Sequence, residues 1–482
     1  MNAEEFEKLA KEVIEYIVDY NGKLRSRNVL PDVEPGYLHH LIPSDAPENP
    51  DHWTKIIPDF DRFIMPGITH WNSPMFNAFY VSAGCYPSIV ADLLSCGIAT
   101  IGIHWLSSPA VTELEVIVLD WLAKLMNLPE HFLASSPGSG GGIIQGSASE
   151  GIFVALITAK DKMVKRLQAK FPDWEEGLIK AKLVAYASDQ SNSSCEKAGR
   201  IGSMKIRLLA SDDQGRLRAD ALQKAILEDR NKGLIPCFVM ATLGTTGTCA
   251  FDDISAVGKI CNAEKIWLHI DAAYAGAAFI CPEFQYLMAG VEYADSFCMN
   301  PHKWLLTTFN CSAFWVKDRH DLTNLFSVDR PYLKANSGDV NGKYAPDFRN
   351  WELPLGRSFR ALKLWLTLRL YGVRNLQNYI RNHCDLAKHF ESLVLQDNRF
   401  ELVCPAIMGL VCFRLKGEDS LSMELLKSIT DERKLYMVAG IFHGKYFIRY
   451  AICSRYMEIK DVELGWNIIV SHADQITRQH NS

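Results

Sequence analysis

Two stretches decide the fold, IWLHIDAAYAG at 266–276 and SFCMNPHKW at 296–304, because each is an apolar run that ends in polar residues. Two similar runs precede them, KLVAYAS at 182–188 and CFVMATLGTT at 237–246, and helical segments lie between the runs. This alternation is typical of a mainly parallel sheet covered by helices on both faces. The sequence therefore predicts an α/β fold with its ligand site at the carboxyl ends of the strands, where these polar residues gather.

The chain changes character on both sides of this core. Residues 1–85 begin with an amphipathic helical pattern and continue with segments rich in Pro, Asp and His, which predicts an arm that wraps another body. Residues 86–360 are expected to form the large α/β domain. Residues 361–482 alternate helical and strand-like segments, so we expect a smaller C-terminal α+β domain.

Composition excludes several classes of function. The chain has 482 residues with 51 Lys+Arg and 56 Asp+Glu, a net charge of −5, and no polybasic stretch for nucleic acid or an anionic membrane. No apolar run reaches the roughly 18 residues of a membrane span, and the acidic start MNAEEFEKLAKEV does not resemble a signal peptide, so a cytoplasmic protein is expected. The 13 cysteines form no CxxC motif, which predicts reduced, mostly buried thiols and no metal site.

Three features together indicate one cofactor. Lys303 follows the apolar SFCM, and partial desolvation there favours its neutral amine, which can form a Schiff base with an aldehyde. Asp271 ends the run IWLHI, where a carboxylate can pair with a protonated ring nitrogen. Ser147 and Glu150 have capping-box spacing and predict a helix N-terminus that can bind a phosphate, whereas the glycines of 135–150 fit neither a Walker nor a dinucleotide motif. Each feature alone has a purely structural explanation, but together they match pyridoxal 5′-phosphate (PLP).

Six segments in order, HWNSP, QGSASE, SSCEKAG, LHIDAAYAG, NPHKW and PYLK, resemble the aromatic L-amino acid decarboxylase branch of the PLP-dependent group II decarboxylases. The resemblance extends from about residue 1 to residue 475. It implies a fold-type I (aspartate aminotransferase-like) homodimer with a mainly parallel seven-stranded sheet, an arm around the partner subunit and active sites at the subunit interface. It also implies PLP bound covalently to Lys303, Asp271 at the pyridine nitrogen and Ala273 against the ring. The remaining cofactor contacts implied by the resemblance are Ala148, Ser149, Thr246, Asn300 and His302.

The resemblance also assigns residues around the substrate. Tyr332 corresponds to the proton donor and lies in a polar loop that we expect to close as a lid. Gly356 stands where histidine decarboxylases carry serine, which favours an aromatic amino acid over histidine. Arg357 and Arg449 are interpreted as structural cations rather than catalysts. The substrate-pocket residues are Trp71, Phe79, Tyr80 and Ser82, and the segment expected to reach in from the partner subunit contains Ile103 and His104.

Position 192 departs from the family pattern, because Asn192 stands where the decarboxylases have a histidine. An amide cannot relay a proton as an imidazole does, so the carbanion left by CO₂ would be protonated slowly and exposed to O₂. The expected products are then an aldehyde, CO₂, NH₃ and H₂O₂. The same substitution marks the insect branch that converts L-dopa to 3,4-dihydroxyphenylacetaldehyde, which links the chain to catecholamine metabolism and cuticle. The sequence therefore favours an aromatic acetaldehyde synthase with O₂ as co-substrate.

Two alternatives remain open. Asn192 can be a tolerated change in a simple decarboxylase that makes dopamine or a related arylalkylamine, and the retained Tyr332 favours this interpretation. The chain can also be a non-catalytic homologue, although the presence of both Lys303 and Asp271 argues against that.

Overall fold

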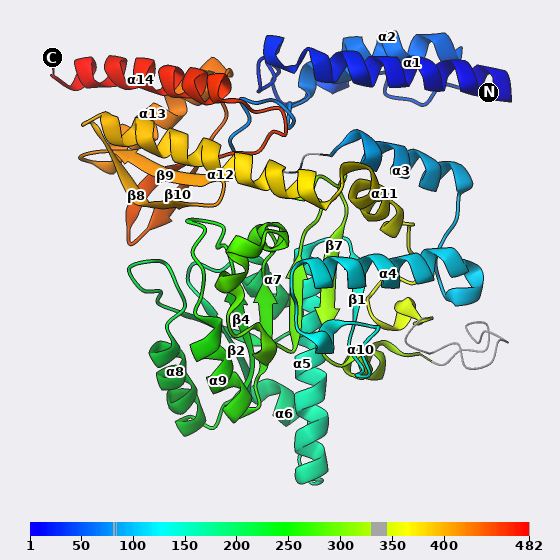
Figure 1. The fold of residues 1–482 in the computed structure, drawn as a ribbon, viewed down its shortest axis with the longest axis vertical. Coiled ribbons are helices and arrows are strands. Elements are labelled where there is room, and N and C mark those ends of the chain that lie inside the picture. The colour runs from blue at the N-terminus through cyan, green and yellow to red at the C-terminus, as the bar shows by residue number, and fades with distance from the viewer. Residues whose placement is uncertain (81, 83, 329–344, 482) are drawn as a thin grey trace. The chain divides into compact units, whose positions relative to one another are not determined.

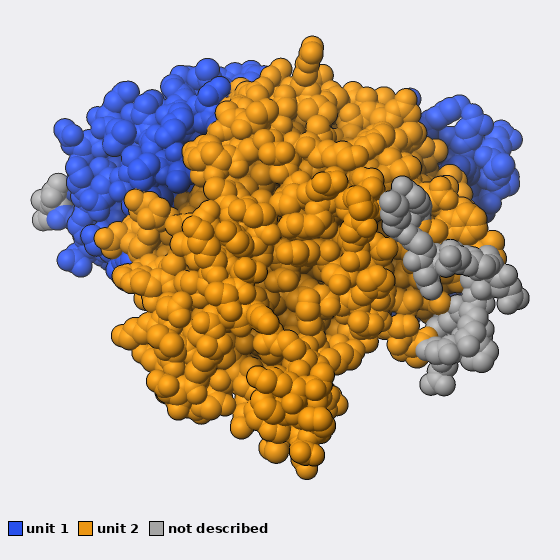
Figure 2. All heavy atoms as spheres, turned by 60° about the horizontal axis from the view of Figure 1, so that its bottom comes forward, with its two compact units in different colours: residues 1–81, 383–482 blue, residues 82–382 orange. Residues whose placement is uncertain are grey.

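The computed structural model describes residues 1–80, 82, 84–328 and 345–481. Two compact units are present, one formed by residues 1–81 with 383–482 and the other by residues 82–382 (Figure 2). The division at residues 85 and 360 that the sequence suggested stays a prediction.

The second unit is built on a seven-stranded sheet with the order β1-β7-β6-β5-β4-β2-β3. Figure 1 labels β1, β2, β4 and β7 of this sheet. β7 is antiparallel to both of its neighbours, and the other adjacent strands are parallel. The predicted α/β fold with a mainly parallel seven-stranded sheet is therefore confirmed. The strands are β1 (Gly141–Gln145), β2 (Leu183–Ser188), β3 (Lys205–Leu209), β4 (Ile235–Thr242), β5 (Trp267–Asp271), β6 (Ser296–Met299) and β7 (Ser312–Val316).

Helices bury both faces of this sheet, which explains why its central strands read as continuous apolar runs. In β2, Ala185 and Ala187 belong to one core cluster with residues of α5, whereas the intervening Tyr186 donates a hydrogen bond to Asp229 of α8 at 3.0 Å. The helices of this unit are α3 (Tyr86–Ile98), α4 (Pro109–Leu125), α5 (Ala148–Lys170), α6 (Glu176–Lys182), α7 (Ser194–Ile201), α8 (Ala219–Asn231), α9 (Ile254–Glu264), α10 (Arg319–Phe326) and α11 (Ala361–Tyr371).

The first unit contains the smaller sheet, with four antiparallel strands in the order β10-β11-β9-β8. This confirms the predicted C-terminal sheet domain. Its strands are β8 (Phe400–Ile407), β9 (Leu410–Leu415), β10 (Val438–Phe442) and β11 (Lys445–Ala451). Its helices are α1 (Ala3–Gly22), α2 (Ile56–Asp59), α13 (Asp419–Glu432) and α14 (Ile459–Asn481), and α12 (Val373–Gln396) contains the boundary between the units.

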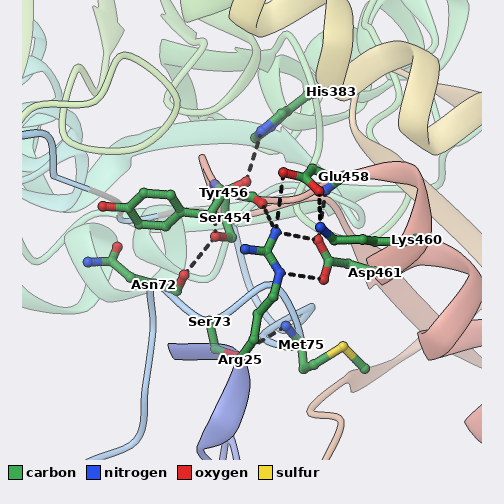
Figure 3. Close-up of polar contacts among 10 residues, drawn as sticks. All are labelled: Arg25, Asn72, Ser73, Met75, His383, Ser454, Tyr456, Glu458, Lys460 and Asp461. Carbon is green, nitrogen blue, oxygen red and sulfur yellow. Dashed lines mark hydrogen bonds and ion pairs between the residues drawn. The ribbon is translucent and has the colours of Figure 1, made fainter. Parts of the chain in front are cut away.

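Polar contacts join the N-terminal residues to the C-terminal part of the same chain (Figure 3). The Arg25 guanidinium donates to both carboxylate oxygens of Asp461 in α14, at 2.9 and 2.8 Å, and to the carbonyl of Tyr456 at 2.6 Å. The Ser454 hydroxyl donates to the carbonyl of Asn72 at 2.6 Å. Two-point pairing between a guanidinium and a carboxylate fixes orientation as well as distance, so these bonds define how residues 1–81 pack within the first unit.

Candidate active site

The carboxyl ends of the parallel strands carry most of the residues expected to bind the cofactor. β5 ends at Asp271, and Asn300 to Lys303 follow β6 directly. Thr246 follows β4, and Asn192 follows β2. Because parallel strands end at one edge of a sheet, the fold brings these side chains to the same edge of the second unit.

Asp271 forms the buried end of this site, with 4% of its surface exposed. Its Oδ1 accepts the Ala273 N–H at 3.0 Å and the Cys298 thiol at 3.8 Å. Burial raises the pKa of Asp271, and the nearby Lys303 ammonium acts in the opposite direction. A buried carboxylate beside a lysine is suited to a cationic partner such as a protonated ring nitrogen.

Two neutral residues beside Lys303 are fixed by hydrogen bonds. The His302 Nδ1 accepts the Cys311 N–H at 2.9 Å, so the ring proton is on Nε2, and burial lowers the His302 pKa to about 3. The Asn300 Oδ1 accepts the Ser312 hydroxyl at 2.7 Å, which sets the orientation of the amide. His302 is therefore a neutral hydrogen-bond donor near pH 7 and not an acid.

The N-terminus of α5 is where the sequence predicts an anion site. The Ser147 Oγ accepts the Glu150 N–H at 3.2 Å, and α5 begins at Ala148 as predicted. A full capping box would also have the Glu150 carboxylate accept the Ser147 N–H, and this part of the prediction is wrong. The Glu150 Oε2 instead accepts the Gly146 N–H at 2.9 Å. First-turn N–H groups of a helix have no acceptor within it, so those of Ala148 and Ser149 are oriented to bind an anion.

Position 192 lies in a chain of hydrogen bonds that reaches this anion site. The Asn192 Nδ2 donates to the Thr246 hydroxyl at 2.9 Å. Its Oδ1 accepts both the backbone N–H and the hydroxyl of Ser194, at 3.0 and 2.6 Å. The Ser194 hydroxyl also lies 2.7 Å from that of Ser149. Asn192 therefore has a structural role at the start of α7 and also links Thr246 to the phosphate end of the site.

Three of the predicted substrate residues belong to the first unit, and two of them, Trp71 and Phe79, form an exposed aromatic surface there. The Trp71 and Phe79 rings stack with centroids 5.7 Å apart, and their side chains are 42% and 46% exposed. Phe79 has a left-handed backbone with φ of 56°, and its carbonyl accepts the Arg449 guanidinium at 3.3 Å. Arg449 also lies 5.0 Å from the centroid of the buried Tyr80 ring. These contacts agree with a structural role for Arg449.

The remaining predicted substrate residues belong to the second unit. Ser82 is half-buried, and the Ile103 and His104 N–H groups donate to the Ser107 hydroxyl at 2.9 and 3.1 Å. Gly356 is exposed, and a Cβ added there would meet only Ile101, at 3.5 Å. A serine would therefore fit at position 356 without strain.

Arg357 lies in a fully buried cluster of charges. Its guanidinium donates to Glu115 at 2.6 Å, to the Ile144 carbonyl at 3.0 Å and to Glu352. Burial raises the pKa of Glu352 to about 7. Since these carboxylates occupy its guanidinium, the structural interpretation of Arg357 fits the geometry.

Tyr332, the predicted proton donor, lies outside the described residues. Within residues 1–80, 82, 84–328 and 345–481, no cluster of His, Cys, Asp and Glu is arranged to hold a metal ion. Nor does that part of the chain contain a helix long and apolar enough to cross a membrane.

Sequence reasoning missed three polar residues that contact the site. Ser194 joins Asn192 to Ser149. The Asn-x-Ser spacing of residues 192–194, which is common at helix starts, could have indicated its contact with Asn192. Cys298 contacts Asp271, and His269 contacts Cys298. Both residues lie within apolar runs, so the sequence pattern indicated only core residues.

The donor set fits PLP. An amine, a buried carboxylate and a helix N-terminus lie on one edge of one sheet, and they match the aldehyde, ring nitrogen and phosphate of that cofactor. Ala273, whose N–H donates to Asp271, carries only a methyl group, which suits close packing against a flat ring.

Comparison with known proteins defines the class. The model of the pyridoxal-dependent decarboxylase conserved domain matches residues 35–416, and the chain belongs to this family of PLP-dependent decarboxylases. Aromatic-L-amino-acid decarboxylase of Cavia porcellus is 52% identical over 478 residues, with 99% of each chain covered.

Two solved structures share the fold closely. An Oryza sativa TDC solved with PLP and tryptamine is 35% identical with a TM-score of 0.94, and 99% of each chain is covered. Rhodiola rosea 4-hydroxyphenylacetaldehyde synthase is 34% identical with a TM-score of 0.91, again over 99% of each chain. The curated relative bears the name of the amine-forming alternative, so the comparisons support that alternative better than the aldehyde synthase that the sequence favoured.

Proposed function

We propose that this chain is a PLP-dependent decarboxylase of an aromatic L-amino acid. The placement of Lys303 and the buried Asp271 at the same sheet edge as the N-terminus of α5 carries the proposal. Lys303 would hold the cofactor aldehyde, Asp271 the ring nitrogen, and Ser149 with the first turn of α5 the phosphate. When bound, PLP supplies an electron sink for the bond between the α-carbon and the carboxylate of the substrate.

The residues of the chain prepare this site in distinct ways. With PLP bound, the Asp271 carboxylate would stabilise a protonated ring nitrogen. Neutral His302 and Asn300 offer hydrogen bonds without adding charge. Thr246 is exposed next to Asn192 and can contact a ligand above the sheet edge.

Two observations support an aromatic substrate: the exposed rings of Trp71 and Phe79, and the names of the related decarboxylases. Trp71 and Phe79 present stacked rings with much of their area exposed, which suits a planar apolar group. Ser82 and Tyr80 are proposed as further pocket residues, and Gly356 as the position that distinguishes an aromatic substrate from histidine.

The test is CO₂ release by purified protein loaded with PLP. We expect turnover of L-dopa, L-tyrosine or L-tryptophan, little with L-glutamate or L-histidine, and none with Lys303→Ala. Turnover of glutamate or histidine in preference to all three aromatic acids would overturn the substrate class, and an active Lys303→Ala protein would overturn the site.

The aromatic amine is the product that the names of the relatives support. It forms when the α-carbon takes a proton after CO₂ has left, and Tyr332 is the proposed proton donor. Dopamine would be the product from L-dopa.

A second product is favoured by one observation, the amide at position 192. Asn192 is held by Thr246 and Ser194 and has no group that titrates near neutral pH, so it cannot pass on a proton. The amino acid, O₂ and water would then give the arylacetaldehyde, CO₂, NH₃ and H₂O₂. In this oxidative deamination the α-carbon loses two electrons to O₂.

Product analysis with and without oxygen separates these outcomes. L-dopa is supplied to the loaded enzyme in air and under argon, and dopamine, 3,4-dihydroxyphenylacetaldehyde and peroxide are quantified. Aldehyde and peroxide in equal amounts in air support the oxidative reaction. Dopamine in equal yield under both gases, without peroxide, supports the simple decarboxylase.

We further propose a homodimer. α1 has no buried residue, and its Phe6, Ile14 and Val18 are at least half exposed although they form an apolar face. On α3, Leu93 and Ile98 are also exposed. An arm and a helix with uncovered apolar faces suit a second copy of the chain, into whose site Ile103 and His104 are proposed to reach. Light scattering should give twice the chain mass of 54.3 kDa, and a monomer at micromolar concentration would contradict the dimer.

A further inference from the structure

A line of polar side chains crosses β5 and β6 behind Asp271. The strands pair in parallel with His269 opposite Ser296 and Asp271 opposite Cys298. Alternate residues of a strand point to the same face, so Trp267, His269 and Asp271 share one face. All five side chains are buried, with between 0% and 5% of their surface exposed.

Consecutive members of this line are within hydrogen-bonding distance. The Trp267 Nε1 donates to the Ser296 Oγ at 2.8 Å, and the same oxygen lies 2.8 Å from the His269 Nδ1. The His269 Nε2 lies 3.6 Å from the Cys298 Sγ, which lies 3.8 Å from the Asp271 Oδ1.

Chemistry allows one direction for these bonds. An ionised carboxylate only accepts, so the Cys298 thiol donates to Asp271 and its sulfur accepts from the His269 Nε2–H. The His269 Nδ1 then carries no proton and accepts the Ser296 hydroxyl. That hydroxyl oxygen accepts from Trp267, whose indole nitrogen only donates.

The protonation states that this direction requires of His269 and Cys298 agree with their surroundings. Burial lowers the pKa of His269 to about 3, so the imidazole is neutral with one ring proton. Burial also raises the pKa of Cys298, so the thiol keeps its proton. Burial raises the pKa of Asp271, whereas the Lys303 ammonium, the Ala273 N–H and the Cys298 thiol lower it and so favour the ionised carboxylate.

We propose that His269 and Cys298 are positioning residues that hold the Asp271 carboxylate ionised and oriented for the cofactor ring nitrogen. They do so through a directed relay from Trp267 through Ser296, His269 and Cys298 to Asp271. The relay occupies Oδ1, which assigns Oδ2 to the ring nitrogen. This inference rests on the proposed function, because it requires that Asp271 faces PLP.

The tautomer of His269 tests the relay in the unmodified protein. Protein labelled with ¹⁵N-histidine gives imidazole signals whose shifts distinguish the two neutral tautomers and the cation, and His269→Gln assigns the signal. The relay predicts the Nε2–H tautomer at neutral pH. An Nδ1–H tautomer or an imidazolium would overturn it.

PLP binding to the apoprotein tests whether the relay supports the contact between Asp271 and the cofactor. Apoprotein is titrated with PLP by absorbance, after thermal unfolding has shown that each variant is folded. Cys298→Ala should raise the Kd for PLP by about twofold to tenfold, as expected for one lost hydrogen bond. Cys298→Ser keeps a donor and should bind more tightly than Cys298→Ala. Cys261→Ala removes an equally buried thiol from α9 and should bind like wild type.

The outcomes separate this inference from the proposed function. If Cys298→Ala binds PLP like wild type, or Cys298→Ser is as weak as Cys298→Ala, the relay is wrong. If wild-type apoprotein does not bind PLP at all, the proposed function is wrong.

Discussion

The two ends of the candidate site differ in how they are built. The Asp271 end lies within paired strands, is almost fully buried and receives its hydrogen bonds from a fixed strand register. The Asn192 end lies in turns after the strands and in the first turns of α5 and α7, with Thr246 and Ser149 exposed and hydroxyl groups as partners. The side chains at the Asp271 end are therefore part of the sheet core, whereas those at the Asn192 end lie outside the sheet.

This difference suggests that the two ends of the site have separate functions under the proposal. The buried end would supply the electron sink, a requirement common to any decarboxylation with PLP. Asn192 belongs to the open end, so under the proposal the choice between amine and aldehyde can change there without a change of fold. Four substitutions test this division, from the largest expected effect to the smallest.

The first prediction concerns the buried end. Asp271→Asn replaces the ionised partner of the ring nitrogen by a neutral amide and should lower kcat by about 10²–10³-fold. Steady-state CO₂ release measures the loss. Asp295→Asn is the control, because the half-buried Asp295 accepts the Leu268 N–H at the other end of β5, and this variant should keep kcat within about threefold. Equal losses in both variants would show that the site has no special need for Asp271.

The second prediction concerns Glu352, a buried carboxylate that contacts Arg357 and not the proposed cofactor site. We expect it to affect the stability of the fold rather than catalysis. The pKa of Glu352 is raised from 4.5 to about 7, chiefly by burial. The folded chain therefore binds more protons than the unfolded chain between these values, and the free energy of unfolding should fall as the pH rises through them. The fall contributed by Glu352 is up to about 3 kcal/mol.

Urea unfolding at about pH 5 and about pH 8 measures this slope. Glu352→Gln mimics the protonated acid and should flatten it, while Glu12→Gln on the exposed face of α1 should leave it unchanged. A slope that persists in Glu352→Gln would contradict the assignment.

The third prediction concerns the open end. Asn192→His introduces an imidazole that can pass on a proton near neutral pH, so the ratio of amine to aldehyde from L-dopa in air should rise by about tenfold. Chromatography of both products measures the ratio. If wild type already makes only amine, or if the variant keeps the wild-type ratio, position 192 does not decide the product.

The fourth prediction has the smallest effect. Ser194→Ala removes the hydroxyl that joins Asn192 to Ser149 and should raise the Kd for PLP by about threefold. The neighbouring Ser193→Ala is a matched control, because the Ser193 side chain makes no capping bond at the start of α7. Identical Kd values for the two variants would show that Ser194 does not support the phosphate site.

The strands of the sheet core could be predicted from the sequence because each is marked by a short apolar run of its own. Runs such as LVAYAS at 183–188 must be buried on both faces, and their polar ends mark the ligand edge. The capping pattern found the start of α5 but not the partner of Glu150, since Gly146 competes for that carboxylate in the folded turn.

Contacts between distant segments could not be predicted. The relay from His269 through Cys298 depends on the register of β5 against β6, which periodicity within one strand does not specify. The bond from Ser194 to Ser149 joins two helix starts that are 45 residues apart in the chain.

The most direct test of the central claim is to locate PLP on the chain. Wild-type protein incubated with PLP is reduced with borohydride and digested, and the modified lysine is identified by mass spectrometry. The proposed site predicts one modified peptide, containing Lys303, and its absence in Lys303→Ala. PLP fixed at another lysine, or none fixed at all, would contradict the claim.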